Sequence, residues 1–567
     1  MGFLKRYGVF LLLLAAFTPL MLRFGWHREI ATVSDDSVSY LTLARWLAGD
    51  TSNAYLARWT WWQAHFPPIF PLLLAVTGAW HNLLAAHLLV AGLAAAALVP
   101  TYRYALMRLE SAPAALSACA LFVLAPAAWI PLVGILSESL FLLLTMAALR
   151  FHERRLRTET ARDGEWLALG LIVALACATR LVGIAMLLAL AMQALLRACG
   201  AREGPRIRQL VIAFIPTVVV LGAWMALRPM EGADKYQGIV ESSLSNWIHN
   251  PLTILPVAST SVLDAWIANF AVDPNAPVAM RIVFIVLGAM ALAGAALAAL
   301  RNRLDGWYFL VYMAVIFGWV FGTEVTRRLL YPVIPLALIL AAVALREAGR
   351  KLRVPARASL FAGGAIAAIP AVLCVPGLLQ VQQKSFDTAQ VLPNSAYANA
   401  DITDYYTTRG PEARAIAAGQ IATLAGLQAL DRATPPGARV MWMRPEYIAF
   451  LGHREGVPWY FDWDARRLAS EVRATGTTHL VLSRYVKTDL TPRPGDPAPL
   501  LPSILEYSRI VLKLPDATDG SDAFLLLEVE PRRLDAYLGV GAAEDQHAAR
   551  EVVPEEHAPG RGHLREE

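Results

Sequence analysis

The sequence is poor in charge and in cysteine. Only 17% of its 567 residues are charged and 56% are hydrophobic, whereas soluble domains average roughly 25% and 45–50%. The four cysteines lie in or beside apolar stretches without the spacing of metal ligands, so we expect neither a disulfide framework nor a cysteine zinc site. Because the apolar residues cluster in long charge-free stretches, the composition indicates a membrane protein and excludes one soluble domain.

Motifs of several soluble enzyme classes are also missing. The chain contains no P-loop, no G-x-G-x-x-G phosphate loop and no G-x-S-x-G nucleophile elbow. The formal net charge of +5 comes from Lys and Arg residues that separate apolar stretches and do not gather on one soluble face. This distribution argues against nucleic-acid binding.

The basic residues indicate which loops lie on one side of the membrane. Six basic clusters separate the apolar stretches, and the positive-inside rule places all six in the cytoplasm. Between two neighbouring clusters on the same side, the chain must cross the membrane an even number of times. This requirement predicts helical hairpins over 111–149, 166–196 and 306–345. We count 11 spans, with the N-terminus inside and the C-terminus outside. The clusters are Lys5/Arg6, Arg103/Arg108, Arg150 to Arg162, Arg197 to Arg208, Arg301/Arg303 and Arg346 to Arg357.

Charge counts agree with this topology and divide the chain into two parts. Residues 1–380 carry 30 basic and 19 acidic side chains, and residues 381–567 carry 20 and 26. Within the first part, the expected cytoplasmic loops hold 20 basic and 8 acidic residues, whereas the outside segments hold 10 and 11. The positive excess is therefore a topology signal.

The expected fold class is a polytopic α-helical membrane protein with a small α/β domain at its C-terminal end. The membrane domain covers 1–380, with outside loops at 24–65 and 228–280. A polar linker over 381–410 precedes a soluble periplasmic domain over 411–540, and 541–567 has the composition of a disordered tail. In the soluble domain we expect helices at 413–432 and 465–475 and strands at 439–443, 479–483 and 523–529.

A few charged residues lie at the expected outward turns, where charge is costly unless it is paired, hydrated or functional. They are Asp35, Asp36, Glu138, Arg180, Arg327 and Arg328. Each has an ordinary alternative: solvated loop acids, a helix cap at Glu138, a snorkelling Arg180, and interface anchors at Arg327 and Arg328. Their common face favours a shared function.

Carboxylates and arginines on one membrane face suit a reaction whose donor carries a phosphate. The planar fork of arginine binds phosphate well, and a carboxylate within reach of an acceptor hydroxyl can act as a general base. A divalent ion on acidic ligands is another way to hold the phosphate. His65, which precedes a Pro-Pro pair, is either an interfacial aromatic or a binding residue.

Five motifs, in order over residues 30–335, resemble the GT-C superfamily of polytopic glycosyltransferases, especially the protein O-mannosyltransferases and lipid A aminoarabinose transferases. They are Asp35-Asp36-Ser37-Val38-Ser39-Tyr40, His65-Phe66-Pro67-Pro68, Ser137-Glu138-Ser139-Leu140-Phe141, Thr179-Arg180-Leu181-Val182-Gly183 and Arg327-Arg328-Leu329-Leu330-Tyr331-Pro332.

The resemblance implies a GT-C fold, a polyprenyl-phosphate sugar donor, inversion at the anomeric carbon and catalysis on the non-cytoplasmic face. It implies Asp35 or Asp36 as base and Glu138 as a second carboxylate, which in some members helps to hold a divalent metal; Asp36 and Glu138 are thus candidate metal ligands. It also implies that Arg180 faces the lipid phosphate together with one further arginine, either Arg327 or Arg328. Tyr40, His65 and Tyr331 are further substrate-binding candidates.

Two departures from the family pattern leave assignments open. The acidic pair is Asp-Asp, where the mannosyltransferases commonly have Asp-Glu, so the base is Asp35 or Asp36. The usual Arg-Tyr is replaced by Arg-Arg-Leu-Leu-Tyr, so the matching arginine is Arg327 or Arg328.

The expected function is an inverting glycosyltransferase at the periplasmic face of a bacterial inner membrane. It would move a sugar from a polyprenyl-phosphate donor to a hydroxyl or phosphate of a lipid, glycan or protein acceptor. The main alternative is a transporter or flippase of lipid-linked sugars, whose site would lie near the bilayer midplane between repeats. The sequence shows no internal repeat, and its charges gather at outward turns. A catalytically silent scaffold is a further alternative.

Overall fold

The computed structural model describes residues 2–24, 35–132, 134–156, 161–200, 205–228, 235–273, 275–353, 368–382, 411–459, 463–484, 500–516 and 520–540. The chain forms two compact units, Met1–Ala425 with Asp516–Gly520, and Gly426–Pro515 with Ser521–Glu567. The tail expected over 541–567 and nearly all of the expected linker lie outside the described residues.

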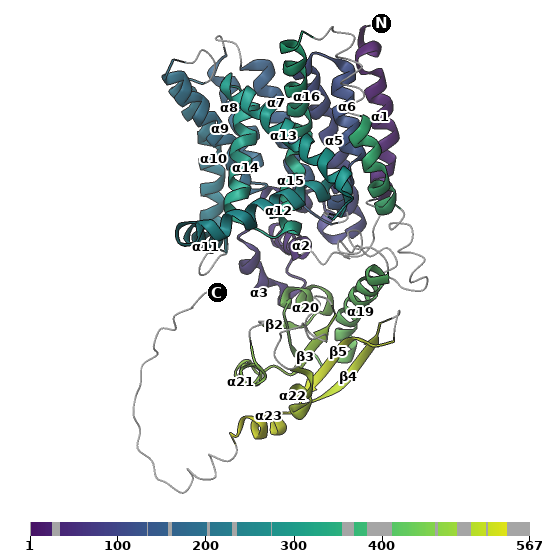
Figure 1. Cartoon of the computed structure of the whole chain (residues 1–567). Helices are drawn as coiled ribbons and strands as arrows, with labels where there is room; N and C mark the ends of the chain where they lie inside the picture. Colours follow the sequence, from purple (N-terminus) through teal and green to yellow (C-terminus); the bar gives the residue numbers. More distant parts are fainter. Residues whose placement is uncertain are drawn as a thin grey trace. The chain divides into compact units, whose positions relative to one another are not determined.

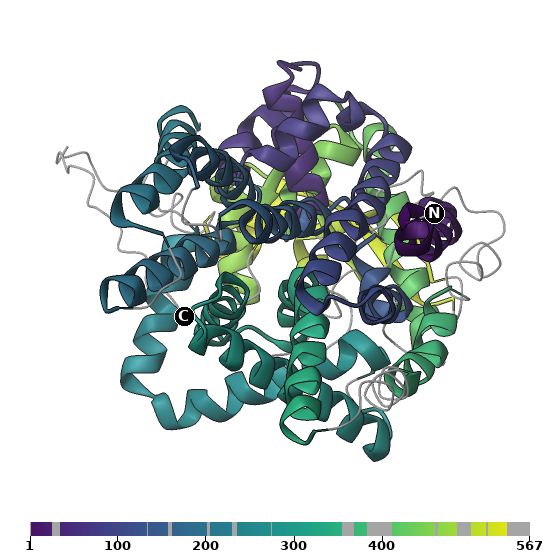
Figure 2. The same cartoon turned by 90° about the horizontal axis from the view of Figure 1, so that it is seen from above.

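The first unit contains a bundle of apolar helices (Figures 1 and 2). Its α-helices are α1 (Gly2–Phe24), α2 (Asp35–Leu47), α3 (Ala54–Gln63), α4 (Ile69–Val76), α5 (Leu83–Leu109), α6 (Ala112–Leu124), α7 (Glu138–Arg155), α8 (Asp163–Cys177), α9 (Ile184–Ala198), α10 (Ile207–Leu227), α11 (Lys235–His249), α12 (Pro251–Ala271), α13 (Val278–Leu300), α14 (Leu304–Trp319), α15 (Thr323–Leu330) and α16 (Ile334–Lys351). An apolar helix at Ala368–Gln382 follows.

Seven helices within the described residues are long and apolar enough to cross a membrane. A bent pair, Ala112–Leu124 with Pro126–Leu132, raises the number to eight if it is one span. The chain is therefore a multi-pass membrane protein, and the count of 11 spans stays a prediction. Each predicted hairpin contains two helices on either side of a break, namely α6 and α7, α8 and α9, and α14 and α16.

The expected outside loop 228–280 is largely helical. It contains α11 and the apolar helix α12, which has the length and hydropathy of a span. Figures 1 and 2 nevertheless show α11 and α12 lying across one end of the bundle, while the long helices beside them run along its axis. Helix α12 contacts α13 and α15, and several of its large apolar side chains, among them Leu252 and Val257, are exposed.

Ion pairs connect the basic clusters at one end of the bundle, here called the basic end. The start of α1 belongs to the same end, since the ring of Phe10 stacks on Tyr102 with centroids 4.1 Å apart. The cross-links between helices are Arg108–Asp305, Arg303–Glu153, Arg208–Asp163, Arg301–Glu347 and Arg346–Glu110. The clusters assigned to one side of the membrane are thus neighbours in space.

Small residues allow the closest contacts between helices. A Cβ atom added at Gly294 of α13 would lie 1.9 Å from the backbone oxygen of Leu340 in α16. A Cβ atom added at Gly170 of α8 would lie 2.5 Å from the backbone oxygen of Ala213 in α10. Close backbone approach of this kind is how membrane helices gain packing energy without a hydrophobic driving force.

The second unit is built on a five-stranded mixed sheet with the order β2-β1-β3-β5-β4. β1 pairs in parallel with β2 and β3, whereas β5 pairs antiparallel with β3 and β4. The strands are β1 (Arg439–Trp442), β2 (Glu455–Pro458), β3 (His479–Ser483), β4 (Ser508–Pro515) and β5 (Asp522–Val529), and the accompanying helices are α19 (Pro411–Ala433, which begins in the first unit), α20 (Pro445–Gly452), α21 (Ala465–Thr475), α22 (Leu500–Tyr507) and α23 (Pro531–Leu538). The three expected strands and two expected helices are present, and β2 and β4 are additional.

Candidate functional site

The first acidic motif begins α2, at the end of the bundle away from the N-terminus (Figure 1). Two hydrogen bonds hold α2 against the start of α7: the backbone N–H of Ile135 donates to Ser37 Oγ at 3.2 Å, and Tyr40 Oη lies 2.9 Å from Ser137 Oγ. The Tyr40 ring also contacts the rings of Phe66 and Phe70 edge-on. These contacts fix the side of α2 that carries Asp36.

Glu138 is the first residue of α7 and is completely buried. Its Oε1 atom lies 2.8 Å from Arg180 Nη1 and accepts hydrogen bonds from Nε of Arg328 at 3.1 Å and from its Nη2 at 2.8 Å. Burying a carboxylate is costly unless it is paired and hydrogen-bonded. The two arginines meet that requirement, so Glu138 is more than a helix cap.

Arg328 joins both expected carboxylates. In addition to its bonds to Glu138, its Nη2 donates to Asp36 Oδ2 at 2.6 Å. Four side chains that are up to 292 positions apart therefore converge, and we call Asp36, Glu138, Arg180 and Arg328 the charged cluster. The Asp36, Arg180 and Arg328 side chains keep exposed fractions of 25%, 15% and 27%, so a ligand can reach the cluster.

The motif with Arg180 is fixed next to the proline segment. Arg180 lies in the break between α8 and α9, and its Nη1 also donates to Ser137 Oγ at 3.3 Å. The N–H of Ile69, just after the Pro-Pro pair, donates to the carbonyl of Ala178 at 2.9 Å. His65 precedes that pair, is buried, and packs its ring 4.3 Å from that of Phe66. His65 thus helps to shape the wall next to Tyr40.

The other predicted residues have different positions. Arg327 is buried, and its backbone carbonyl accepts from Asn269 at 3.3 Å. Tyr331 follows α15, is buried, and packs against Phe122. Asp35 begins α2, but its side chain lies outside the described residues. Ser37 and Ser137, which flank Asp36 and Glu138 in the sequence, also belong to the site, although the sequence pattern alone does not predict their contacts.

The charged cluster does not fit a divalent metal. The guanidinium of Arg328 lies between Asp36 and Glu138, within hydrogen-bond distance of both carboxylates, where a shared ion would have to bind. No group of three or more His, Cys, Asp and Glu side chains within the described ranges is arranged to hold an ion. Asp36 and Glu138, the candidate metal ligands, are thus arranged as partners of an arginine.

The cluster lies at the end of the bundle opposite the basic end. Helix α7 runs from Glu138 to Arg155 over 18 residues, a rise of roughly 27 Å. Glu153, near the far end of α7, pairs with Arg303 of the basic end. The position at a helix end, away from the bundle middle, favours a reaction at one membrane face over a transport site at the midplane.

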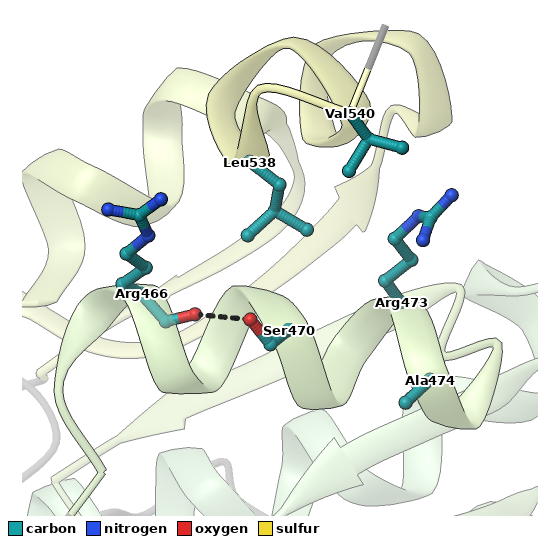
Figure 3. A pocket seen from close by; sticks show the side chains of 6 residues that line it. All are labelled: Arg466, Ser470, Arg473, Ala474, Leu538 and Val540. Carbon is teal, nitrogen blue, oxygen red and sulfur yellow. Dashed lines mark hydrogen bonds between the residues drawn. The ribbon is translucent and has the colours of Figure 1, made fainter. Parts of the chain in front are cut away.

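A separate cavity of about 520 Å³ lies in the second unit, between α21 and the end of α23 (Figure 3). Arg473 there pairs with Asp535 at 2.8 Å, and Ser470 donates to the carbonyl of Arg466 at 3.0 Å. Its lining residues are Arg466, Ser470, Arg473, Ala474, Leu538 and Val540. None of these can act as a general base near neutral pH, so this cavity is not a candidate reaction centre.

No protein-family model and no curated protein sequence matches the chain. Solved structures do match. ArnT from Cupriavidus metallidurans, bound to undecaprenyl phosphate, gives a TM-score of 0.51 at 15% identity and covers 92% of this chain and 98% of its own. The Archaeoglobus fulgidus oligosaccharyltransferase, tethered with an acceptor peptide, gives a TM-score of 0.50 at 13% identity. The match covers 92% of this chain and 74% of the oligosaccharyltransferase. At these identities the likeness shows the fold.

Proposed function

We propose that this chain, which has the GT-C fold, is an inverting glycosyltransferase that moves a sugar from a polyprenyl-phosphate donor to an acceptor. The observation that carries the proposal is the charged cluster, in which four side chains from separate motifs converge at one end of the bundle. The predicted positive-inside topology puts this end on the periplasmic face of a bacterial inner membrane.

The cluster contains the groups that such a transfer needs. An Asp36 carboxylate accepts the proton of the acceptor hydroxyl, and the acceptor oxygen forms its bond to the anomeric carbon from the face opposite the phosphate. The bond between that carbon and the phosphate oxygen breaks, and polyprenyl phosphate leaves. One displacement inverts the anomeric centre. Arg180 and Arg328 stabilise the negative charge that develops on the leaving phosphate.

The remaining candidates surround this arrangement. Tyr40 and His65, with Phe66, form an aromatic wall beside the cluster, which suits the apolar face of a sugar ring. Arg327 and Tyr331 belong to the same segment as Arg328 and are proposed to complete the donor site. Asp35 stays an alternative base, because it begins the same helix as Asp36.

The structural neighbours support a lipid-linked donor but leave the acceptor open. ArnT was solved with undecaprenyl phosphate, and the oligosaccharyltransferase with an acceptor peptide. The acceptor proposed here is accordingly a hydroxyl or phosphate of a lipid, glycan or protein.

The proposal is tested by following labelled sugar from a polyprenyl-phosphate donor to extracted envelope acceptors. The full-length protein in proteoliposomes is expected to transfer the label with inverted anomeric configuration. Movement of intact donor across the bilayer without transfer would support the flippase alternative instead. If the protein neither binds polyprenyl phosphate nor transfers sugar, the result would support the alternative of a catalytically silent scaffold.

A further inference from the structure

The charged cluster is electrically balanced before any donor binds. Its two arginines, Arg180 and Arg328, face two carboxylates, Asp36 and Glu138. Of the two acids, Glu138 is the more deeply placed, with no exposed side-chain surface, whereas 25% of the Asp36 side chain is exposed. Glu138 is therefore held inside the protein against Arg180 and Arg328, whose positive charges favour its ionised form.

Glu138 binds both arginines through one oxygen. Oε1 receives one contact from Arg180 and two from Arg328, while Oε2 is buried without a hydrogen-bond partner among the described residues. Each guanidinium has five N–H donors. Glu138 thus occupies donors on both arginines and partly neutralises their charge toward any other anion.

We propose that Glu138 is a counter-ion that weakens the hold of Arg180 and Arg328 on polyprenyl phosphate and so speeds release of the product. This role rests on the proposed function. Glu138 is a positioning residue in this scheme, because it acts through the arginines and takes no proton from the acceptor.

The charges of donor and product explain why such a counter-ion is useful. The sugar-bearing donor is a phosphodiester with one negative charge. The product is a phosphomonoester, whose charge at neutral pH is about −1.5 to −2. Arginines without a counter-ion would therefore hold product more tightly than donor, and repulsion by Glu138 acts most strongly on the more charged product.

The test measures binding of undecaprenyl phosphate to the full-length protein in nanodiscs. The E138Q variant is expected to bind it at least roughly tenfold more tightly than wild type, because neighbouring charges couple strongly when they are buried. The undecaprenyl-phosphate sugar donor should gain less affinity than the product. In turnover, E138Q should show a lower KM for the donor, a lower kcat and stronger inhibition by product.

The matched control is E347Q. Glu347 is also bound by two arginines, Arg301 at 2.8 Å and Arg350 at 2.6 Å, but it lies at the basic end. E347Q should leave undecaprenyl-phosphate affinity unchanged. If thermal unfolding shows that E138Q does not fold, the comparison is made between R180Q and R180Q/E138Q, where the double variant should bind more tightly.

The outcomes separate this inference from the proposed function. Wild type that binds no undecaprenyl phosphate contradicts the proposed function itself. Wild type that binds it, with E138Q binding equally or more weakly, overturns the counter-ion role and leaves the transferase proposal standing. If E347Q gained as much affinity for undecaprenyl phosphate as E138Q, the gain would be a general effect of removing a negative charge. That result would also overturn the inference.

Discussion

At the scale of single residues, Asp36 is the side chain on which the proposed chemistry depends. Replacing it by Asn keeps its size and removes the basic oxygen that accepts the acceptor proton. We expect D36N to lower the initial rate of sugar transfer by roughly 10²–10⁴-fold, the usual contribution of a general base. The measurement is the rate at saturating donor and acceptor.

The control for D36N is D50N. Asp50 is also an acid of the segment after the first span, and hydrogen bonding from the backbone N–H of Ser52 lowers its pKa. It pairs with Arg45 outside the charged cluster, so D50N should transfer at the wild-type rate. Full activity in D36N would move the base assignment to Asp35.

The residues of the cluster could be found from the sequence, but their contacts could not. Charge at an outward turn is conspicuous in an apolar sequence, so Asp36, Glu138, Arg180 and the Arg327-Arg328 pair all stood out. Neighbouring residues on a helix point roughly 100° apart. Which arginine reaches the carboxylates therefore depends on the rotation of α15, which tertiary packing sets. Arg328 reaches both.

At the scale of helices and strands, the contact between α13 and α16 depends on Gly294. An alanine there would put its Cβ 1.9 Å from the Leu340 oxygen, so one of the two backbones must move. We expect G294A to destabilise the protein by about 1–3 kcal/mol, the range for overpacked positions. The measurement is the midpoint of thermal unfolding in detergent.

The matched variant is G92A in α5. A Cβ at Gly92 meets nothing within 4 Å, and Ala favours a helix over Gly by roughly 1 kcal/mol. G92A should therefore unfold at the same temperature or higher. Equal destabilisation by both variants would contradict the close contact. The sequence does not distinguish these two glycines, since both stand in apolar helices.

Strand β3 gives the second unit a pH dependence. His479 is buried in it, and burial lowers its pKa, so the folded domain favours the neutral imidazole. The unfolded chain has a histidine pKa of roughly 6.5 and binds more protons below that value. The contribution of His479 to the free energy of unfolding is therefore complete above about pH 6.5. It decreases as the pH falls below that value and through the lower pKa that His479 has in the folded domain.

The expected result is that the unfolding midpoint of the second unit, followed in the full-length protein, decreases from pH 7.5 to pH 5.5. H479Q, which does not titrate, should lose part of this decrease. An identical pH dependence in H479Q would assign the effect to other groups.

The secondary structure of the second unit was predictable where the pattern is strong. The expected helix 465–475 and strand 479–483 coincide with α21 and β3. β2 has only four residues, including Gly456 and Pro458, and it is a strand because β1 pairs with it. In the first unit, α12 has the length and composition of a span but lies across one end of the bundle (Figures 1 and 2), an orientation that composition does not predict.

At the scale of the whole molecule, the partition of charge predicts which loops share one side of the membrane, and the structure brings the basic clusters together at one end of the bundle. The GT-C fold expected from the motifs agrees with the structural neighbours. The basic clusters predicted to share one side are joined by ion pairs such as Arg108–Asp305 and Arg346–Glu110. Charges order the loops because moving them across a membrane is costly, whereas the number of spans depends on short helices that composition alone does not resolve.

The orientation itself can be tested with a native cysteine. Cys199 is exposed, whereas Cys119, Cys177 and Cys374 are buried. Cys199 follows Arg197 in a basic cluster, so it should lie in the cytoplasm. A membrane-impermeant maleimide should therefore label the protein in inside-out vesicles and not in intact spheroplasts, and C199S should lose the labelling.

A second cysteine reports the other face. Ser52 is exposed in the segment after α2, whose first turn carries Asp36. In a C199S background, S52C is expected to react in spheroplasts, because the charged cluster should face the periplasm. Labelling of S52C only in inside-out vesicles would reverse the orientation and place the cluster in the cytoplasm. A donor presented in the periplasmic leaflet could not then reach it, and the proposed reaction would have to occur on the other side.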